Sequence, residues 1–166
     1  MDVLCSDLVA LLRQEIEQYR QLLALIRRER GYIVRGEFTQ LAMIVKNKAT
    51  VSEGLGYLAE RRASLLRGLA ESLGEPPEKL TLARVSRTVP GRSGESLAAL
   101  LDEFRGVVGR LVTTNEINRT LLERSLESVR GSLDLFRTVA SAGPIYGANG
   151  RIEGSSPVAA GLNQTA

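Results

Sequence analysis

The spacing of apolar residues in the first part of the chain constrains the fold most. Apolar side chains recur there at alternating steps of four and three residues, and no glycine or proline interrupts them before Gly31. The positions on this stripe are Cys5, Val9, Leu12, Ile16, Tyr19, Leu23, Ile26, Arg30 and Ile33. Because a strand would need alternation over a short length, the pattern predicts an amphipathic helix over about residues 3–34.

The same spacing returns over residues 37–73 and predicts a second helix. We expect a tight turn at Gly36, because glycine adopts the left-handed conformation at helix ends at little cost. One continuous helix through Gly36 is the alternative. Lys48 and Arg62 interrupt the second stripe, and we expect their aliphatic stems to cover the apolar seam while their charges reach water.

Turn-forming residues then separate the second helix from a third. Residues 74–93 are predicted to be a linker, within which Leu80, Leu82 and Val85 could form a short helical turn. The third helix is predicted over about residues 94–140, and its stripe contains one extra step of four after Leu122, which relaxes a supercoil locally. This helix would be roughly 65–70 Å long at about 1.5 Å per residue.

The fold class predicted from these elements is all-α: an elongated antiparallel bundle, or coiled coil, of three long helices within residues 1–140. Residues 141–166 are rich in glycine and small polar residues. They carry too little apolar surface to offset the entropy lost on ordering, so they are predicted to form a flexible tail.

The composition argues against catalysis and against metal or cofactor binding. The chain has no histidine, and Cys5 is its only cysteine, which indicates a cytosolic protein. Glu15 and Glu29 are interpreted as surface partners of nearby arginines. We expect no catalytic residue, no metal site, no cofactor and no membrane insertion. Nucleic-acid binding is suggested only by the basic pI of about 9.3, and no reading motif supports it.

Two asparagines stand out on the stripe of the third helix. Asn115 and Asn118 occupy seam positions, surrounded by polar neighbours. Our preferred interpretation is a buried polar layer that fixes the register of the helices, because a seam asparagine does this at some cost in stability. The alternative is an amide pair that binds the backbone of a partner.

Several sequence blocks together resemble the FlgN family of flagellar export chaperones, over roughly residues 4–152. The blocks are Leu22–Arg30, Gly36-Glu37, Lys46–Lys48, Arg61–Leu66, Asn115–Leu122 and Tyr146–Gly150. The resemblance implies a cytoplasmic, non-enzymatic helical protein. It would bind the hook–filament junction proteins FlgK and FlgL before type III secretion, prevent their premature association and help to deliver them to the export apparatus.

The resemblance also places client contacts towards the C-terminal part of the chain. Residues 153–166 depart from this expectation, since they look too glycine-rich for a strong amphipathic helix. The candidate binding surface is Leu122, Leu126, Val129, Leu133 and Phe136, with Ile145 and Tyr146 in the tail. The alternative for the five helical positions is ordinary bundle core. A rival function is a structural coiled coil that self-associates and needs no client.

Overall fold

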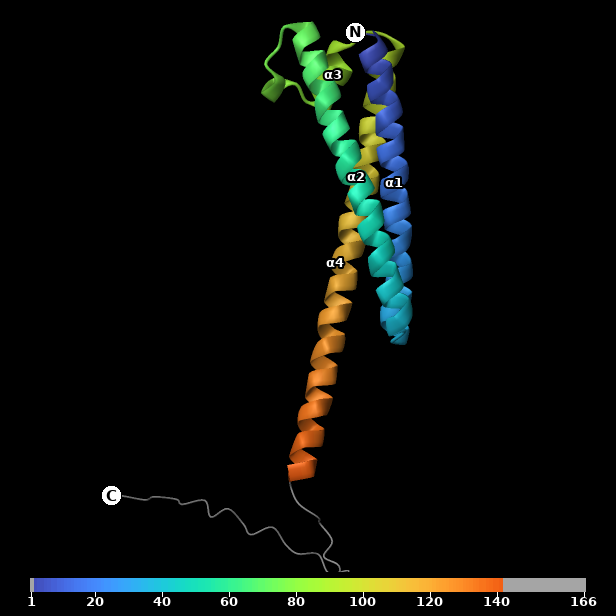
Figure 1. Cartoon of the computed structure of the whole chain (residues 1–166), viewed down its shortest axis with the longest axis vertical. Helices are drawn as coiled ribbons and strands as arrows, with labels where there is room; N and C mark the ends of the chain where they lie inside the picture. Colours follow the sequence, from blue (N-terminus) through green and yellow to red (C-terminus); the bar gives the residue numbers. More distant parts are fainter. Residues whose placement is uncertain (1, 142–166) are drawn as a thin grey trace, which may run out of the picture. The chain divides into compact units, whose positions relative to one another are not determined.

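The computed structural model describes residues 2–141, and most of these residues are helical (Figure 1). The elements are α1 (Asp2–Arg35), α2 (Phe38–Leu73), the 3-10 turn η1 (Pro77–Lys79), α3 (Leu82–Thr88) and α4 (Arg92–Ser141). No strand occurs within residues 2–141. The all-α prediction is therefore confirmed, and the ranges 3–34, 37–73 and 94–140 fall on α1, α2 and α4.

The predicted number of helices was wrong, because the segment between α2 and α4 contains a further short helix. The side chain of Thr81 accepts a hydrogen bond from the backbone N–H of Arg84 (3.2 Å) and caps α3. The guanidinium of Arg84 donates to both carboxylate oxygens of Glu75 (2.7 and 2.8 Å), which ties α3 to the end of α2. The helical turn expected near Leu80, Leu82 and Val85 is thus present, as η1 followed by α3.

The chain turns at Gly36, so the alternative of one continuous helix is excluded. Gly36 has a φ of 68°, in the left-handed region. The N–H of Gly36 donates to the carbonyl of Ile33 (3.2 Å), and the N–H of Glu37 donates to that of Tyr32 (3.0 Å). This hydrogen-bond pattern satisfies the last carbonyls of a helix and ends it. As a result, α1 and α2 form an antiparallel hairpin.

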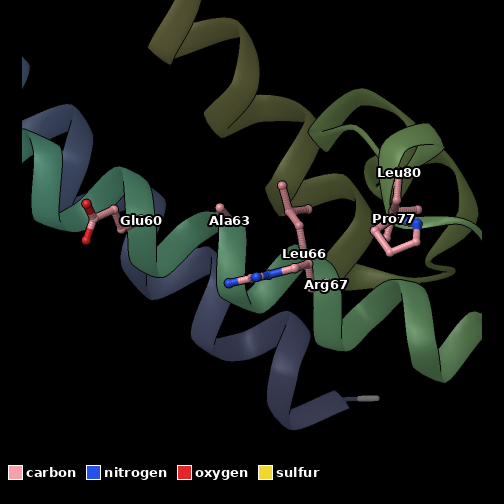
Figure 2. Close-up of a pocket in the computed structure, with 6 residues that line it drawn as sticks. All are labelled: Glu60, Ala63, Leu66, Arg67, Pro77 and Leu80. Carbon is pink, nitrogen blue, oxygen red and sulfur yellow. The ribbon is translucent and has the colours of Figure 1, made fainter.

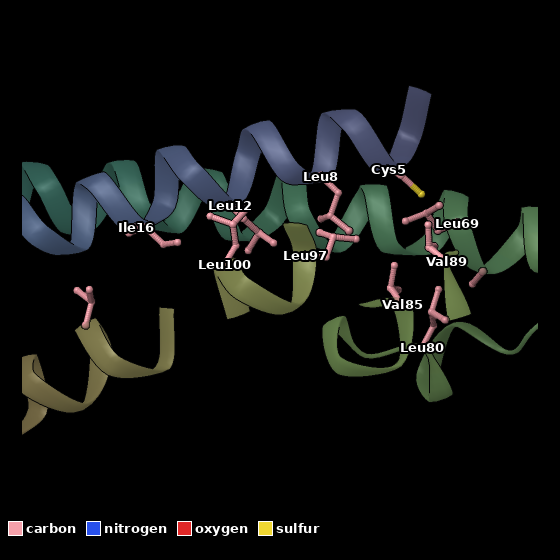
Figure 3. Packing of buried hydrophobic residues seen from close by; sticks show 12 residues of the cluster. Cys5, Leu8, Leu12, Ile16, Leu69, Leu80, Val85, Val89, Leu97 and Leu100 are labelled. Carbon is pink, nitrogen blue, oxygen red and sulfur yellow. The ribbon is translucent and has the colours of Figure 1, made fainter. Parts of the chain in front are cut away.

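The described residues divide into two units, residues 2–123 and residues 124–141, and α4 contributes residues to both. The core of the first unit is built from α1, the end of α2, α3 and the start of α4 (Figure 3). Its buried residues are Cys5, Leu8, Leu12, Ile16, Leu69, Ala70, Leu80, Val85, Val89, Leu97, Leu100 and Val107. A smaller cluster along the hairpin contains Leu22, Ile26 and Leu55.

Two residues of this unit depend on close packing. Cys5 is completely buried, and burial raises the pKa of its thiol, so it behaves as a small apolar side chain. Gly94, at the start of α4, lies so close to the carbonyl oxygen of Val89 that a Cβ atom would clash with it. Glycine at this position therefore allows α4 to pack against the end of α3. None of the described helices is long and apolar enough to cross a membrane.

Candidate functional site

Asn118 is the centre of a buried polar cluster that joins α4 to the hairpin. Its side chain is 1% exposed. Its Nδ2 donates to the backbone carbonyl of Ile26 (2.7 Å) and to Oε2 of Glu29 (3.0 Å). Its Oδ1 accepts from Nε of Arg30 (3.3 Å). Because the amide both donates and accepts, it fixes α4 at one position against α1.

Glu29 extends this cluster to α2. It is 4% exposed, and Nζ of Lys48 donates to both of its carboxylate oxygens at 2.9 Å. A buried carboxylate is tolerated when it is paired and hydrogen-bonded, and Glu29 meets both conditions. Glu29, Lys48 and Asn118 therefore connect all three long helices.

A second buried ion pair joins α1 and α2 closer to the core. Glu15 is 1% exposed and accepts a hydrogen bond from the guanidinium of Arg62. Burial raises the pKa of the Glu15 carboxyl above its ordinary value of 4.5, against the lowering effect of Arg62. The guanidinium of Arg62 also lies over the ring of Phe104 in α4, 5.8 Å from its centroid. Phe104 in turn meets the ring of Tyr19 edge-on, at 5.3 Å between centroids.

The later part of α4 has a different character, because it exposes large apolar side chains. They range in exposure from 40% for Leu122 to 70% for Phe136. The set comprises Leu122, Leu126, Val129, Leu133, Leu135, Phe136 and Val139. Every residue of the range 124–140 is exposed. We call this set the α4 apolar face.

Five residues of the α4 apolar face lie at other heptad positions than the buried residues of α4, namely Leu122, Leu126, Val129, Leu133 and Phe136, whereas Leu135 and Val139 continue the buried positions. Within the first unit, α4 buries Leu97 and Asn118 at one heptad position, and Leu100 and Val107 at another. Continued beyond Asn118, the first of these positions holds Ser125 and Ser132, followed by Val139. The run of leucine, valine and phenylalanine from Leu122 to Phe136 therefore follows a separate phase.

A comparison with protein families identifies the chain. The model of the FlgN protein family matches residues 1–154. The chain belongs to the FlgN family. No curated protein and no solved structure matches it. Membership of the FlgN family confirms the resemblance seen in the sequence blocks and points to a flagellar export chaperone.

Two interpretations of charged residues were wrong for this FlgN-family chain. Glu15 and Glu29 are buried, not on the surface, and their partners lie in α2. Lys48 and Arg62 do not direct their charges only to water, since each pairs with one of these carboxylates. The spacing in the sequence was a signal of this pairing: Glu15 and Glu29 are two heptads apart, and Lys48 and Arg62 are also two heptads apart.

The remaining predicted residues are placed as follows. Asn118 is buried as described, whereas Asn115 is exposed, and its side chain makes no hydrogen bond with the residues that the structure describes. Leu122, Leu126, Val129, Leu133 and Phe136 are exposed together in the α4 apolar face. Ile145 and Tyr146 lie outside the described residues, as does the predicted tail beyond Ser141.

The described part of the FlgN-family chain offers no arrangement suited to metal chemistry. Within residues 2–141, no group of three or more histidine, cysteine, aspartate or glutamate residues is placed to hold a metal ion. The buried carboxylates are used in contacts between helices.

Proposed function

We propose that this FlgN-family chain is a cytoplasmic flagellar export chaperone for the hook–filament junction proteins, FlgK and FlgL. It would bind them before type III secretion and prevent their premature association. The α4 apolar face would be the client surface, with Ile145 and Tyr146 contributing from the segment that follows. The observation that carries this proposal is the exposure of large apolar side chains along Leu122–Val139.

The chemistry of the face favours a helical client. Leu122, Leu126, Val129, Leu133 and Phe136 follow steps of four and three residues, which is the spacing that a partner helix packs against. Full burial of an apolar side chain of this size contributes about 1.5–3 kcal/mol, and these side chains begin between 40% and 70% exposed. Several of them acting together can offset the cost of ordering a client helix.

The charged residues beside the face leave it open to a partner. Two ion pairs beside the face lie within α4 itself: Arg119 donates to Glu123 at 2.9 Å, and Arg137 lies 3.8 Å from Asp134. Both are exposed pairs, which contribute little to stability and break easily when a partner binds. The face would therefore be covered without rearrangement of the core of the first unit.

The test is calorimetric titration of the full chain with C-terminal helical segments of FlgK and FlgL. We expect saturable 1:1 binding, and at least a tenfold loss of affinity in Leu126→Ser/Leu133→Ser. The matched control is Met43→Ser/Val45→Ser, which removes two similarly exposed apolar side chains from α2. It should bind as the unchanged protein does, and equal weakening by both double variants would contradict the proposal.

A truncation after Ala140 separates the two parts of the proposed surface. Retention of most of the affinity would assign binding to the α4 apolar face. Complete loss would assign it to the segment that contains Ile145 and Tyr146. No binding by the full chain to either segment would refute the FlgK and FlgL assignment.

Self-association is the second candidate, because an exposed apolar heptad face can also pack against a second copy of itself. This would make the chain a homo-oligomeric coiled coil without a flagellar client. Sedimentation equilibrium distinguishes the two functions. A stable oligomer that Leu126→Ser/Leu133→Ser dissociates, together with no client binding, would favour the structural coiled coil.

A further inference from the structure

The part of α4 in the second unit, residues 124–141, is a helix whose described side chains are not buried. Every residue of the range 124–140 is exposed. Within the first unit, α4 instead buries Leu97, Leu100, Val107 and Asn118. Most helical stability in proteins comes from packing an apolar face against other elements. The segment 124–141 therefore depends on its own local interactions.

The first unit shows what packing does for an element that is weak by itself. The 3-10 turn η1 has three residues and α3 has seven, and both are too short to be stable in isolation. Val85 of α3 is completely buried, and Leu80 is 4% exposed. Figure 2 shows Pro77 and Leu80 next to each other at the pocket that they line together with Leu66 of α2. The core thus holds these elements in place, and residues 124–140 have no such support.

The residues of this segment favour the helix only weakly. Many of them have low intrinsic helix propensity, because they are glycine, β-branched, aromatic or short polar residues. They are Ser125, Ser128, Val129, Gly131, Ser132, Asp134, Phe136, Thr138, Val139 and Ser141. The last turn of α4 contains no basic residue to interact with its terminal carbonyls. Local propensity therefore gives a helix that opens easily from its C-terminal end.

The side-chain interactions within the segment add little. The hydroxyls of Ser132 and Thr138 donate to the backbone carbonyls of Ser128 and Asp134, each at 2.9 Å. Bonds of this kind compete with the helical hydrogen bond and slightly destabilise the helix. The ion pair of Arg137 with Asp134 is exposed, and exposed pairs contribute little. The segment therefore belongs to the part of the molecule in which local unfolding costs least.

Gly131 is the weakest helical position of the segment. Glycine in a helix is about fivefold less favourable than alanine, because it loses more backbone freedom. A Cβ atom at Gly131 would meet nothing within 4 Å, so no described neighbour requires glycine there. Gly131 also lies at the heptad position farthest from the stripe of Leu126, Val129 and Leu133. Alanine at this position would therefore favour the helix without adding a contact to a client.

We propose that residues 124–141 exchange between helix and coil in the free protein, and that a bound client fixes them as a helix. This inference rests on the proposed function, because the segment carries most of the α4 apolar face. The apparent affinity for a client is then reduced in proportion to the fraction of molecules in which the segment is helical. Unwinding of the segment separates the apolar side chains from one another, which gives the chaperone a route to release its client.

Gly131→Ala tests the proposal, and Gly109→Ala is its matched control. Both glycines are exposed in α4, and a Cβ atom at either position would meet nothing within 4 Å. In calorimetric titration with the FlgK and FlgL segments, Gly131→Ala should bind up to about fivefold more tightly than the unchanged protein, in step with its gain in helical population. Gly109→Ala should bind as the unchanged protein does, because the core already holds the helix there.

Urea unfolding of the first unit should show the opposite pattern. Gly109→Ala should raise the urea midpoint, because alanine favours the helix in the folded first unit. Gly131→Ala should leave the midpoint unchanged, because its segment opens independently of the core. Equal effects of the two variants on the midpoint would show that α4 unfolds as one unit, which would overturn the proposal.

NMR chemical shifts of the Cα atoms in the free chain measure the helical population without a client. For residues 124–141 we expect values between coil and helix, moved towards helix in Gly131→Ala, and full helical values for residues 97–118. Full helical values over residues 124–139 of the unchanged protein, or no gain of affinity in Gly131→Ala, would overturn the proposal. Intermediate values without binding of either segment would confirm the exchange and refute the FlgK and FlgL assignment, so the two failures are distinguishable.

Discussion

At the scale of single residues, the two buried carboxylates have different surroundings. Glu29 accepts hydrogen bonds from Lys48 and Asn118, whereas the hydrogen-bond donor described for Glu15 is Arg62 alone. Desolvation is therefore less fully compensated at Glu15, and the pKa of its carboxyl is raised. Glu15 is therefore the residue on which we test a pH effect.

The raised pKa of the Glu15 carboxyl predicts a specific pH dependence of stability. Its folded pKa lies above its value in the unfolded chain, so between these two values the folded state holds the extra proton. Stability must then fall as pH rises from about 4.5 through the folded pKa of Glu15, in proportion to the difference in bound protons. We expect Glu15→Gln to remove this fall.

The measurement is the free energy of unfolding by urea at intervals from pH 4 to pH 7, for the unchanged protein and for Glu15→Gln. Subtracting one profile from the other cancels the contribution of the exposed carboxylates to the free energy of unfolding, because both proteins contain them. The difference should show the unchanged protein losing stability relative to the variant as pH rises. A difference that is flat, or that rises with pH, would contradict the assignment.

At the scale of elements, the two ion pairs specify how α1 and α2 are aligned. Glu15 pairs with Arg62 and Glu29 pairs with Lys48, and both pairs obey the same antiparallel register. A slip of one heptad would place Glu15 opposite Leu55 or Leu69, and Glu29 opposite Leu41 or Leu55. Apolar contacts alone would tolerate such a slip. The slip would be costly for Glu15 and Glu29, because each buried carboxylate would face a leucine and lose its ion-pair partner.

The variant Lys48→Leu reproduces this unpaired situation at one site. We expect it to destabilise the protein by about 3–5 kcal/mol, the usual cost of removing one partner of a buried ion pair. The double variant Glu29→Leu/Lys48→Leu should recover most of this loss, since both charges are then absent. The measurement is the free energy of urea unfolding.

Lys46→Leu is the control for this prediction, because Lys46 is an exposed lysine two positions away in the same helix. It should change stability by no more than about 0.5 kcal/mol. If Lys48→Leu were equally harmless, the pair would not specify the register of the hairpin.

The long elements could be predicted from sequence because their apolar spacing persists over many turns. Helix α3 was expected only as a helical turn within a linker, since Leu82–Thr88 covers only two turns and a period cannot be established over so short a segment. Of the two asparagines expected at the seam of α4, Asn118 is buried and Asn115 is exposed. The second buried heptad position of α4 is that of Leu100 and Val107, and Asn115 lies one residue after it.

The contacts between helices were the least predictable feature. The periodicity of one helix shows which face is apolar, but not which charged residue of a neighbouring helix lies opposite. The pairing of Lys48 with Glu29 follows only when the turn at Gly36 fixes the alignment of α1 and α2. The exposure of the α4 apolar face was likewise open in the sequence, where its residues fitted bundle core equally well.

At the scale of the whole molecule, the buried and the exposed apolar side chains of α4 lie in different parts of the helix. The residues that hold the first unit together are buried or paired, and Asn118 is the last buried side chain described along α4. Beyond it, within residues 122–139, the apolar side chains are exposed. A family of export chaperones requires a surface that can hold a client and later release it, and this face has the chemistry to do so.

Hydrogen–deuterium exchange of the full chain, with and without a saturating C-terminal segment of FlgL, tests this account most directly. The account predicts slower exchange in peptides that cover residues 122–139, with exchange in the α1–α2 hairpin unchanged. Saturated binding that leaves residues 122–139 unprotected, or that protects the hairpin instead, would contradict the assignment of the α4 apolar face as the client surface.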